Sequence, residues 1–319
     1  MNEFDFIRRY LTRHAAPDAE LVLGVGDDAA ILRPQAGYDW HISSDMLLAG
    51  RHFFADVAPQ DLAHKVLAVN LSDMAAMGAQ PRYALLSAAL PNLDETWLDA
   101  FCSAFFALAD QYGVRLIGGD TTRGDLTFNI TIIGQTPHGQ ALRRDAAQVG
   151  DDVWVSGSLG LAAAALAQHL GEIRLPEPLF NVCEARRLRP EPRVALAQAL
   201  LGIAHAAQDI SDGLLQDAAH IARASACGMD IFAEKIPSPP ELRTFAAYND
   251  WVLAGGDDYE LLFTAAPAAA EQVLNAARAC NTAVTRIGRV TEGTACRAWH
   301  ADGTEIILTR QGFDHFASP

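Results

Sequence analysis

Residues 59 to 79 read Pro59-Gln-Asp-Leu-Ala-His-Lys-Val-Leu-Ala-Val-Asn-Leu-Ser-Asp-Met-Ala-Ala-Met-Gly-Ala79. The run predicts a helix from Pro59 to Met77, because proline suits a first helical turn and Gly78 with Pro81 ends the helix. Beyond Val66 its residues are apolar on nearly every side, which is typical of a helix buried between other elements. The fold is therefore expected to enclose this helix.

Asp73 lies on the apolar stripe of this predicted helix. An ionised carboxylate in such a place costs several kcal/mol unless hydrogen bonds or a cation compensate its charge. The chain offers no lysine or arginine between Lys65 and Arg82 that could pair with it locally. A bound metal ion is the simplest partner that the sequence suggests.

Strands and helices alternate on both sides of this helix, which predicts an α/β (α+β) fold. In the first half we expect helices at Phe4–His14 and Asp94–Tyr112 and strands at Leu21–Val25, Ala29–Leu32, Trp40–Ser43, Tyr83–Leu90, Arg115–Ile117 and Leu126–Gly134. The pattern restarts near residue 148, with a strand at Asp152–Ser156, helices at Leu161–Leu170 and Val194–Leu201, and a surface loop at Arg186–Arg193. We therefore expect two domains, residues 1–148 and 149–319.

The composition excludes several classes of protein. The formal net charge is −15, from 39 acidic and 24 basic side chains, so the surface repels nucleic acid and anionic membranes. No apolar run is long enough for a membrane span, and Met1-Asn-Glu-Phe-Asp5 shows no signal-peptide pattern. The five cysteines are scattered without a CxxC pair, which indicates reduced thiols. We expect a cytoplasmic protein.

Aspartates beside glycine or serine recur at six places and form the main functional signal: Gly26-Asp27-Asp28, Ser43-Ser44-Asp45, Asn70-Leu71-Ser72-Asp73, Gly119-Asp120, Asp209-Ile210-Ser211-Asp212 and Gly256-Asp257-Asp258. Any one of them has an ordinary interpretation as a turn residue or helix cap. Together they offer carboxylate, hydroxyl and carbonyl oxygens, which suit Mg²⁺, Mn²⁺ or Ca²⁺. Several carboxylates that converge on one site imply more than one ion.

The common phosphate-binding motifs are missing. There is no GxxxxGK[ST] loop, and Gly24-Val25-Gly26 is followed by a strand-like segment where a dinucleotide site needs a helix. Bound phosphates would need metal ions, glycine amides such as Gly118-Gly119, and arginines such as Arg143 or Arg144, although these two could equally be solvated surface charges. A two-carboxylate glycosidase remains an alternative, but it does not explain six clusters.

The ordered motifs resemble the thiamine-monophosphate kinases. They are Val25-Gly-Asp-Asp-Ala-Ala, Ser43-Ser-Asp-Met-Leu-Leu-Ala-Gly-Arg-His-Phe, Ala68-Val-Asn-Leu-Ser-Asp-Met-Ala-Ala-Met-Gly-Ala, Leu116-Ile-Gly-Gly-Asp-Thr-Thr-Arg-Gly, Asp209-Ile-Ser-Asp-Gly-Leu, Ala254-Gly-Gly-Asp-Asp-Tyr-Glu-Leu and Gly312-Phe-Asp-His-Phe. The resemblance runs from residue 24 to the C-terminus. It implies a two-domain fold like that of aminoimidazole ribonucleotide synthetase, with an N-terminal ATP/Mg-binding domain whose mixed sheet pairs across a homodimer.

The resemblance also implies an activity and a set of site residues. The activity is Mg²⁺-dependent transfer of the γ-phosphoryl group of ATP to thiamine monophosphate, without a protein nucleophile or base. The implied metal ligands are Asp28, Ser43, Ser44, Asp45, Asp73, Asp120, Asp209 and Asp212. The implied ATP contacts are Gly119, Asp120, Arg144 and Ser211, and the implied substrate contacts are His52, Glu260 and Phe313. Ser44, Asp257 and Phe313 depart mildly from the family pattern, and Phe313 leaves stacking rather than a hydroxyl contact.

Relatives with the same ATP site remain alternatives. They are aminoimidazole ribonucleotide synthetase, selenophosphate synthetase and the hydrogenase-maturation dehydratase. The first twenty residues contain no cysteine for selenium handling, and the chain ends Ala317-Ser318-Pro319 without a terminal cysteine. Both observations disfavour the last two. An alternative of another class is a nucleotide sensor that binds Mg²⁺-ATP without turnover.

Overall fold

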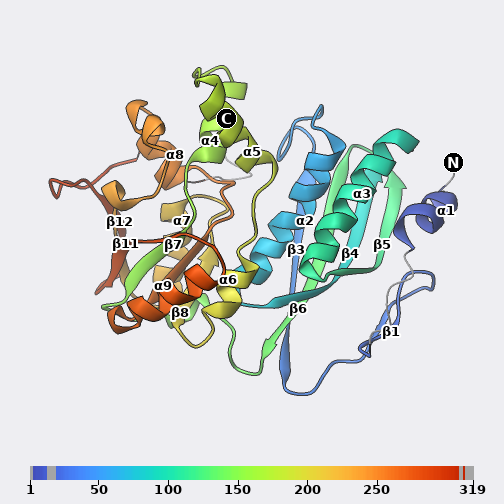
Figure 1. The fold of residues 1–319 in the computed structure, drawn as a ribbon, viewed down its shortest axis with the longest axis horizontal. Coiled ribbons are helices and arrows are strands. Elements are labelled where there is room, and N and C mark those ends of the chain that lie inside the picture. The colour runs from blue at the N-terminus through green and yellow to red at the C-terminus, as the bar shows by residue number, and fades with distance from the viewer. Residues whose placement is uncertain (1–2, 13–18, 309–311, 313–319) are drawn as a thin grey trace. The chain divides into compact units, whose positions relative to one another are not determined.

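The computed structural model describes residues 3–12, 19–308 and 312. The chain divides into two compact units (Figure 1). Unit 1 comprises the chain up to Met74 together with Ala79–Gly139, and unit 2 comprises Ala75–Gly78 and the chain from Gln140 onward. The sequence pattern placed the division near residue 148, a few residues after the point where unit 2 resumes.

Unit 1 contains a four-stranded mixed sheet in the order β3-β6-β4-β5. Its strands are β3 (Tyr38–Leu48), β6 (Thr127–Pro137), β4 (Gln80–Leu90) and β5 (Arg115–Arg123). The β3–β6 and β6–β4 pairs are antiparallel, whereas β4 and β5 run parallel. Outside this sheet, unit 1 adds α1 (Glu3–Phe6), a π-helical turn at Ile7–Leu11, and a ribbon of β1 (Leu21–Leu23) and β2 (Ile31–Leu32).

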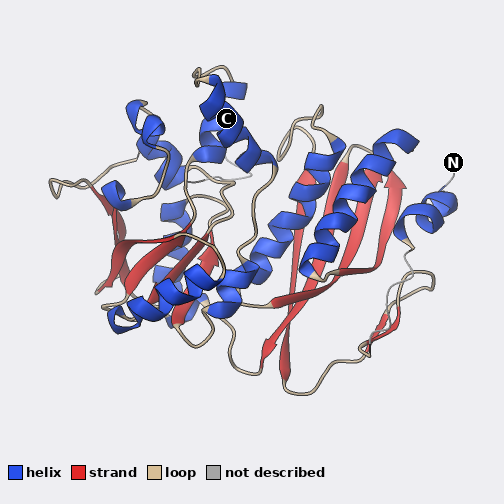
Figure 2. Ribbon diagram, viewed as in Figure 1, coloured by secondary structure: helices blue, strands red, loops and turns tan. Residues whose placement is uncertain are grey.

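Two long helices, α2 (Pro59–Ala76) and α3 (Glu95–Tyr112), lie along one face of this sheet (Figure 2). The side chain of Asp94 caps α3 by accepting from the Trp97 N–H at 2.9 Å, and Gly113 ends the helix in the left-handed region. Phe101 of α3 stacks on Phe128 of β6 with ring centroids 4.7 Å apart. These contacts bury the helix-covered face of the sheet.

The other face of the sheet, which we call the open face, is partly exposed. Side chains alternate along a strand, so Ile42, Ser44, Met46 and Leu48 of β3 share this face. Ile42 is 67% exposed and Met46 is 55% exposed. The β1–β2 ribbon covers another part of the open face, where its residues pack on the cluster of Tyr83, Ile117 and Ile133. An exposed apolar strip therefore remains along β3.

Unit 2 is built on a six-stranded sheet in the order β12-β9-β11-β7-β10-β8. The strands are β7 (Asp152–Ser156), β8 (Ala204–Asp209), β9 (Gly228–Phe232), β10 (Leu261–Ala265), β11 (Val284–Thr291) and β12 (Cys296–Trp299). Neighbouring strands are antiparallel, except for the parallel pair β12–β9. Every residue of β7 and β10 is buried, as expected for strands covered on both faces.

In the described part of unit 2, six helices accompany this sheet (Figure 1): α4 (Leu161–His169), α5 (Glu177–Leu188), α6 (Val194–Ala199), α7 (Leu214–Ala224), α8 (Tyr248–Ala254) and α9 (Ala270–Ala279). Short 3-10 turns lie at Arg144–Ala146, Ala233–Lys235, Pro240–Thr244 and Pro267–Ala269. The hydrophobic core of unit 2 includes Val153, Leu262 and Ile287 from the central strands and Ile221 from α7. None of the helices in the described part of the chain is both long enough and apolar enough to cross a membrane.

The predicted two-domain α/β architecture is confirmed, with three local corrections. The segment Arg186–Arg193 was expected to be a surface loop, but its first residues end α5, and Arg187 and Arg193 are buried. Gly118-Gly119-Asp120 was expected after a strand, yet the three residues lie within β5. The helix expected at Phe4–His14 divides into α1 and the π-helical turn, which ends at Leu11, and residues 13 and 14 lie outside the described residues.

Candidate active site

On the helix-covered side of unit 1, polar groups of β3 and α2 meet. The hydroxyl of Ser43 donates to Oδ2 of Asp73 at 2.5 Å, and the backbone N–H of Asp45 donates to Oδ1 of Asn70 at 3.2 Å. Asn70 is fully buried and donates in turn to the carbonyl of Val66. Asp73, which the sequence placed in an apolar stripe, is half-buried and has a hydroxyl partner. The structure thus brings Ser43, Asp45 and Asp73 to one region.

Ser44 and Asp120 lie on the open face instead. Ser44 contacts Thr131 Oγ1 at 3.1 Å and donates to the Ile130 carbonyl at 3.1 Å. The strand register places Asp120 in one row with Ser87, Asn129 and Met46, so its side chain shares the face of Ser44. The two residues occupy opposite edges of the sheet, and three strand spacings separate them by about 14 Å. They cannot bind one ion within a single chain.

Gly119 has a stringent steric requirement. Its φ is +147°, and a Cβ at this position would overlap the Leu86 carbonyl of the neighbouring strand. Only glycine allows β5 to approach β4 this closely. Glycine at position 119 therefore has a structural cause. Because β5 is an edge strand, the Gly119–Asp120 backbone lies at an exposed edge of the sheet.

Asp28 and His52 lie in connecting segments of unit 1. Asp28 is exposed between β1 and β2, and its N–H donates to Oδ1 of Asp27 at 2.8 Å. The Nδ1 atom of His52 accepts from the Leu48 N–H at 3.0 Å, just after β3 ends. In the neutral imidazole this hydrogen bond places the ring proton on Nε2, which makes Nε2 a donor.

In unit 2, two acidic motifs form one structural element. Residues 209–213 and 255–260, which we call the paired loops, lie side by side and continue the β8–β10 pairing. The N–H groups of Asp257 and Tyr259 donate to the carbonyls of Ser211 and Ile210, each at 2.8 Å. A Cβ on Gly256 would overlap the Ser211 carbonyl, so this close approach requires glycine. Asp257 and Tyr259 both have positive φ values, which indicates local backbone strain.

Asp258 points away from this pairing, toward the start of α4. Its Oδ2 accepts from the Gly160 N–H at 2.9 Å. Burial raises the pKa of Asp258 well above its ordinary value, against the lowering effect of the backbone N–H groups of Gly160 and Ala162. This carboxyl therefore ties the second paired loop to α4.

Sequence reasoning missed Asp217, which is 1% exposed on α7. Its Oδ2 accepts from the backbone N–H groups of Ser211, Asp212 and Gly213 at 3.1, 3.2 and 3.1 Å. Burial raises the pKa of Asp217 to about 7, and the negative charges of Asp209 and Asp212 add to this effect. The only sequence signal was an acidic residue in the first turn of a helix, which is common.

Glu260 is 3% exposed and fully engaged with neighbours inside unit 2. Its Oε2 accepts from Ser156 Oγ at 2.5 Å and from Arg193 Nε at 2.6 Å, while its Oε1 accepts from Arg193 Nη2 at 2.6 Å. A Cβ on Gly157 would overlap this carboxylate. Burial opposes the charge of Arg193, but Glu260 and Glu191 raise the pKa of the guanidinium above its ordinary value. One lone pair of Oε1 remains for a further donor.

Arg144 lies in the 3-10 turn that precedes β7, with its carbonyl accepting from Ser225 Oγ at 2.7 Å. Its guanidinium is near His220 of α7. Burial lowers the pKa of His220, and the positive charge of Arg144 lowers it further. The neighbouring Arg143 instead forms an exposed ion pair with Asp145 at 2.5 Å. The structure therefore gives different surroundings to two arginines that residue chemistry alone left equivalent.

Phe313 lies outside the described residues. The adjacent Gly312 packs closely on the turn that follows the first paired loop, since a Cβ there would lie 2.7 Å from the Asp212 carbonyl oxygen and would overlap Gln216. Glycine at 312 thus allows the chain to reach the Asp212–Gln216 turn. The predicted stacking role of Phe313 stays a prediction.

The donor set agrees with a hard cation. Ser43, Asp45 and Asp73 in unit 1, and Asp209 and Asp212 in unit 2, offer only oxygens, which suit Mg²⁺. Within residues 3–12, 19–308 and 312, no three His, Cys, Asp or Glu side chains are close enough to form a metal site by themselves. Water and substrate phosphates commonly complete a magnesium site, so such donors fit this ion.

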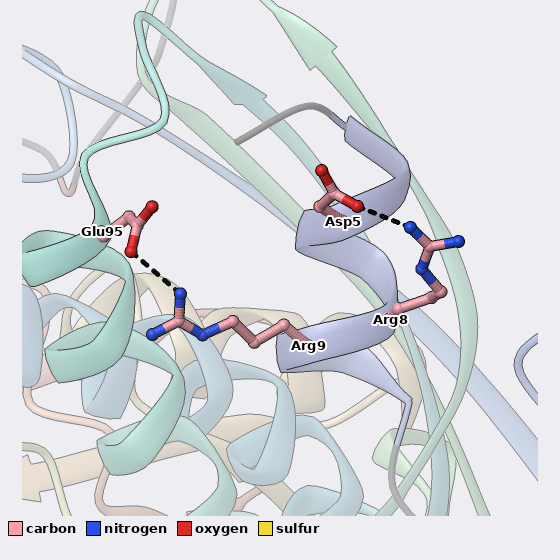
Figure 3. A pocket seen from close by; sticks show the side chains of 4 residues that line it. All are labelled: Asp5, Arg8, Arg9 and Glu95. Atoms are coloured by element: carbon pink, nitrogen blue, oxygen red, sulfur yellow. Dashed lines mark hydrogen bonds and ion pairs between the residues drawn. The ribbon is translucent and has the colours of Figure 1, made fainter.

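A surface pocket in unit 1 is separate from all these groups. Figure 3 shows its lining, Asp5, Arg8, Arg9 and Glu95, which form the ion pairs Arg8–Asp5 at 2.5 Å and Arg9–Glu95 at 2.9 Å. These four side chains are largely exposed, and exposed ion pairs contribute little to stability. None of the residues predicted from the sequence lines this pocket.

Comparison with known proteins defines the class of this chain. Family models described as "AIR synthase related protein, N-terminal domain" and "AIR synthase related protein, C-terminal domain" match residues 26–136 and 148–300. The two units and their mixed sheets are therefore those of an AIR synthase related protein.

Full-length relatives narrow the class. Thiamine-monophosphate kinase from Salmonella typhimurium is 40% identical over 321 residues, with 99% of each chain covered. The crystal structure of thiamine-monophosphate kinase from Stenotrophomonas maltophilia is 44% identical, covers 90% of this chain and 93% of its own, and has a TM-score of 0.83. The structure of AaThiL complexed with AMPPCP and TMP is 31% identical, covers 92% of both chains, and has a TM-score of 0.77. The chain belongs to the thiamine-monophosphate kinase family, which confirms the resemblance seen in its sequence.

Proposed function

We propose that this chain transfers the γ-phosphoryl group of ATP to thiamine monophosphate and forms thiamine diphosphate and ADP. The observation that carries the proposal is the similarity to thiamine-monophosphate kinases along 99% of the chain. Two of this chain's acidic motifs lie on β3 and α2 of unit 1, and two more form the paired loops of unit 2. The reaction consumes ATP, and all five cysteines are free, so we assign the chain to the cytoplasm.

The chemistry needs no protein base or nucleophile. The acceptor is a phosphate monoester whose second pKa is about 6, so at pH 7 it is largely dianionic and already nucleophilic. The main obstacle is repulsion between two polyanions. When bound, Mg²⁺ would neutralise part of this charge and help to align the in-line transfer.

The remaining tasks fall to residues of this chain. The oxygens of Asp28, Ser43, Ser44, Asp45, Asp73, Asp120, Asp209 and Asp212 would hold the magnesium ions. Ser211, Arg144 and the exposed Gly119–Asp120 backbone would contact ATP. His52, through its Nε2–H, would contact thiamine monophosphate. Phe313 and the remaining lone pair of Glu260 Oε1 would contact the same substrate. These assignments follow family resemblance, position by position, and agree with the oxygen-rich donor set.

A homodimer would complete the site. Ser44 and Asp120 share the open face but lie at opposite edges of the sheet, so one chain cannot bring them together. A two-fold axis parallel to the strands would place the β3 edge of one copy opposite the β5 edge of the other. The exposed apolar side chains of Ile42 and Met46 would then be covered. We therefore propose that two copies pair through their open faces and that each supplies Asp120 to the other.

Product analysis tests the proposed activity. Purified protein is incubated with ATP, Mg²⁺ and thiamine monophosphate, and the nucleotides and thiamine phosphates are separated by chromatography. We expect ADP and thiamine diphosphate in equal amounts and no turnover when a chelator removes Mg²⁺. ADP without thiamine diphosphate would instead favour another member of the class, such as a synthetase or dehydratase. A nucleotide sensor would release no ADP in response to any acceptor.

A further inference from the structure

The carboxylate of Asp217 has no task in the reaction described above, although it is one of the most buried acidic groups of unit 2. It is 1% exposed, and its Oδ2 accepts three successive backbone N–H groups, those of Ser211, Asp212 and Gly213. Its Oδ1 accepts from Nε2 of Gln208 at 2.7 Å, which fixes the orientation of the carboxylate. Such convergence requires the first paired loop to curve around a single oxygen atom.

The opposite side of this loop is also held. The carbonyls of Ile210 and Ser211 accept from Tyr259 and Asp257 of the second paired loop. The N–H groups therefore face Asp217, while the carbonyls face the other loop. Gly213, with φ +128°, allows the chain to turn from this segment into α7. Asp217 supplies the side-chain acceptor that fixes the path of residues 211–213.

We propose that Asp217 is a positioning residue for the nucleotide site, which holds Ser211 and Asp212 in place by accepting their backbone N–H groups. The inference rests on the proposed function, because it takes the first paired loop to be the part of unit 2 that meets the magnesium–ATP complex. Asp217 touches no ligand itself. Its effect on ATP binding passes through the backbone of the loop, since displaced N–H groups would turn the neighbouring side chains away.

A purely structural role makes a different prediction. If Asp217 only begins α7, its loss should lower the melting temperature without changing nucleotide affinity in the folded protein. The conservative variant Asp217→Asn helps to separate the two roles, because its amide oxygen can still accept the three N–H groups. Gln208 can rotate its amide and offer Oε1, which has no hydrogen-bond partner in the structure, to the new NH₂ group. Asp217→Leu has a similar size but no acceptor.

The experiment is a calorimetric titration of the full-length protein with a non-hydrolysable ATP analogue and Mg²⁺, without acceptor. We expect Asp217→Leu to raise the dissociation constant at least about tenfold and Asp217→Asn to change it by less than about threefold. In steady-state assays the KM for ATP should rise in Asp217→Leu, while the KM for thiamine monophosphate should not. The matched control is Asp151→Asn, a 3% exposed carboxylate that accepts the Gln148 N–H at the other end of the sheet. It should lower the melting temperature and leave the dissociation constant unchanged.

Two results with the Asp217 variants would overturn the proposal. One is a folded Asp217→Leu protein with wild-type nucleotide affinity, and the other is an Asp217→Asn protein as defective as Asp217→Leu. If Asp217→Leu does not fold, Gln208→Leu decides, because it keeps the carboxylate and removes the donor that orients it. We expect its dissociation constant to rise about threefold, and no change would overturn the proposal. A wild-type protein that binds the analogue but forms no thiamine diphosphate contradicts the proposed function alone.

Discussion

Glu260 forms a buried ion pair with Arg193. Because of this pair, a contact between Glu260 and thiamine monophosphate cannot be measured by replacing Glu260 alone. Glu260→Gln would leave the Arg193 guanidinium with only the exposed Glu191 as a charge partner, and breaking a buried pair costs about 3–5 kcal/mol. Any loss of thiamine monophosphate affinity in this variant would therefore be mixed with partial unfolding. The Glu260 carboxylate also presents less negative charge to thiamine monophosphate than the sequence alone suggests, because Arg193 neutralises it.

Replacing both partners separates stability from binding. We expect the double variant Glu260→Met, Arg193→Met to fold with near wild-type stability, since a buried pair replaced by apolar side chains is often neutral. Its affinity for thiamine monophosphate should fall by about 1–3 kcal/mol if Glu260 Oε1 accepts a hydrogen bond from this substrate. Its affinity for an ATP analogue should hardly change. Calorimetric titration with each ligand provides both values. Unchanged acceptor binding in the folded double variant would remove Glu260 from the substrate site.

Asp73 is the residue whose metal role can be tested most cleanly. In Asp73→Asn the amide oxygen can still accept from the Ser43 hydroxyl, so the melting temperature of the metal-free protein should stay the same or rise. Turnover should fall at least about 100-fold, because a lost magnesium ligand removes several kcal/mol of charge stabilisation. Thermal melts and steady-state rates check the two parts. A large drop in melting temperature without metal would mark Asp73 as a structural hydrogen-bonding residue.

The paired loops depend on glycine where their backbones touch. Gly256→Ala would force a Cβ onto the Ser211 carbonyl and push the two loops apart, at a cost of about 1–3 kcal/mol. We expect a lower melting temperature together with weaker binding of Mg²⁺-ATP, measured by calorimetry. Gly171→Ala is the control: φ is +74° there, but no atom lies within 4 Å of the added Cβ. It should cost about 1 kcal/mol of backbone strain and leave nucleotide affinity unchanged. Equal effects of both variants on ATP binding would contradict a specific loop displacement.

The elements with strong periodic patterns were predictable from the sequence, and those set by distant partners were not. A helix was expected over Asp94–Tyr112, and the structure has α3 from Glu95 to Tyr112, with Asp94 as its N-cap. Arg187 and Arg193 were assigned to a surface loop because their segment is polar and contains two prolines, yet Glu184 and Glu260 neutralise them in the interior. Glu184 is a local partner, three residues before Arg187, but no local pattern reveals Glu260, which follows Arg193 by 67 residues.

The candidate site shows the same division. The sequence indicated Asp73 and the paired-loop aspartates as candidates from their setting and from family resemblance. It could not show that Ser44 and Asp120 share a face at opposite edges of a sheet, because this depends on strand order and register. The sequence predicted no role for Asp217, because an aspartate in a first helical turn is common. Its importance follows from where three N–H groups converge.

The open face of unit 1 predicts the association state of the whole chain. Ile42→Asp places a charge in the strip that a second copy would cover, where an uncompensated buried charge is costly. We expect the wild-type protein to sediment as a dimer at micromolar concentration and Ile42→Asp to sediment near the mass of one 34.3 kDa chain. Val182→Asp on α5 is the control, because Val182 is also exposed, at 52%. A monomeric wild-type protein, or a dimer unaffected by Ile42→Asp, would contradict pairing through this face.

The separation of Ser44 and Asp120 on opposite edges of one sheet also makes complementation possible between two inactive proteins. In a mixed dimer of an Asp120→Ala chain and an Asp73→Ala chain, one site would lack both aspartates. The other site would combine the intact Asp73 of the first chain with the intact Asp120 of the second. Random reassortment makes half of the dimers mixed, each with one intact site, so about a quarter of the wild-type activity should return after mixing. Mixed chains that stay inactive after verified subunit exchange would show that each copy builds its site from its own Asp120.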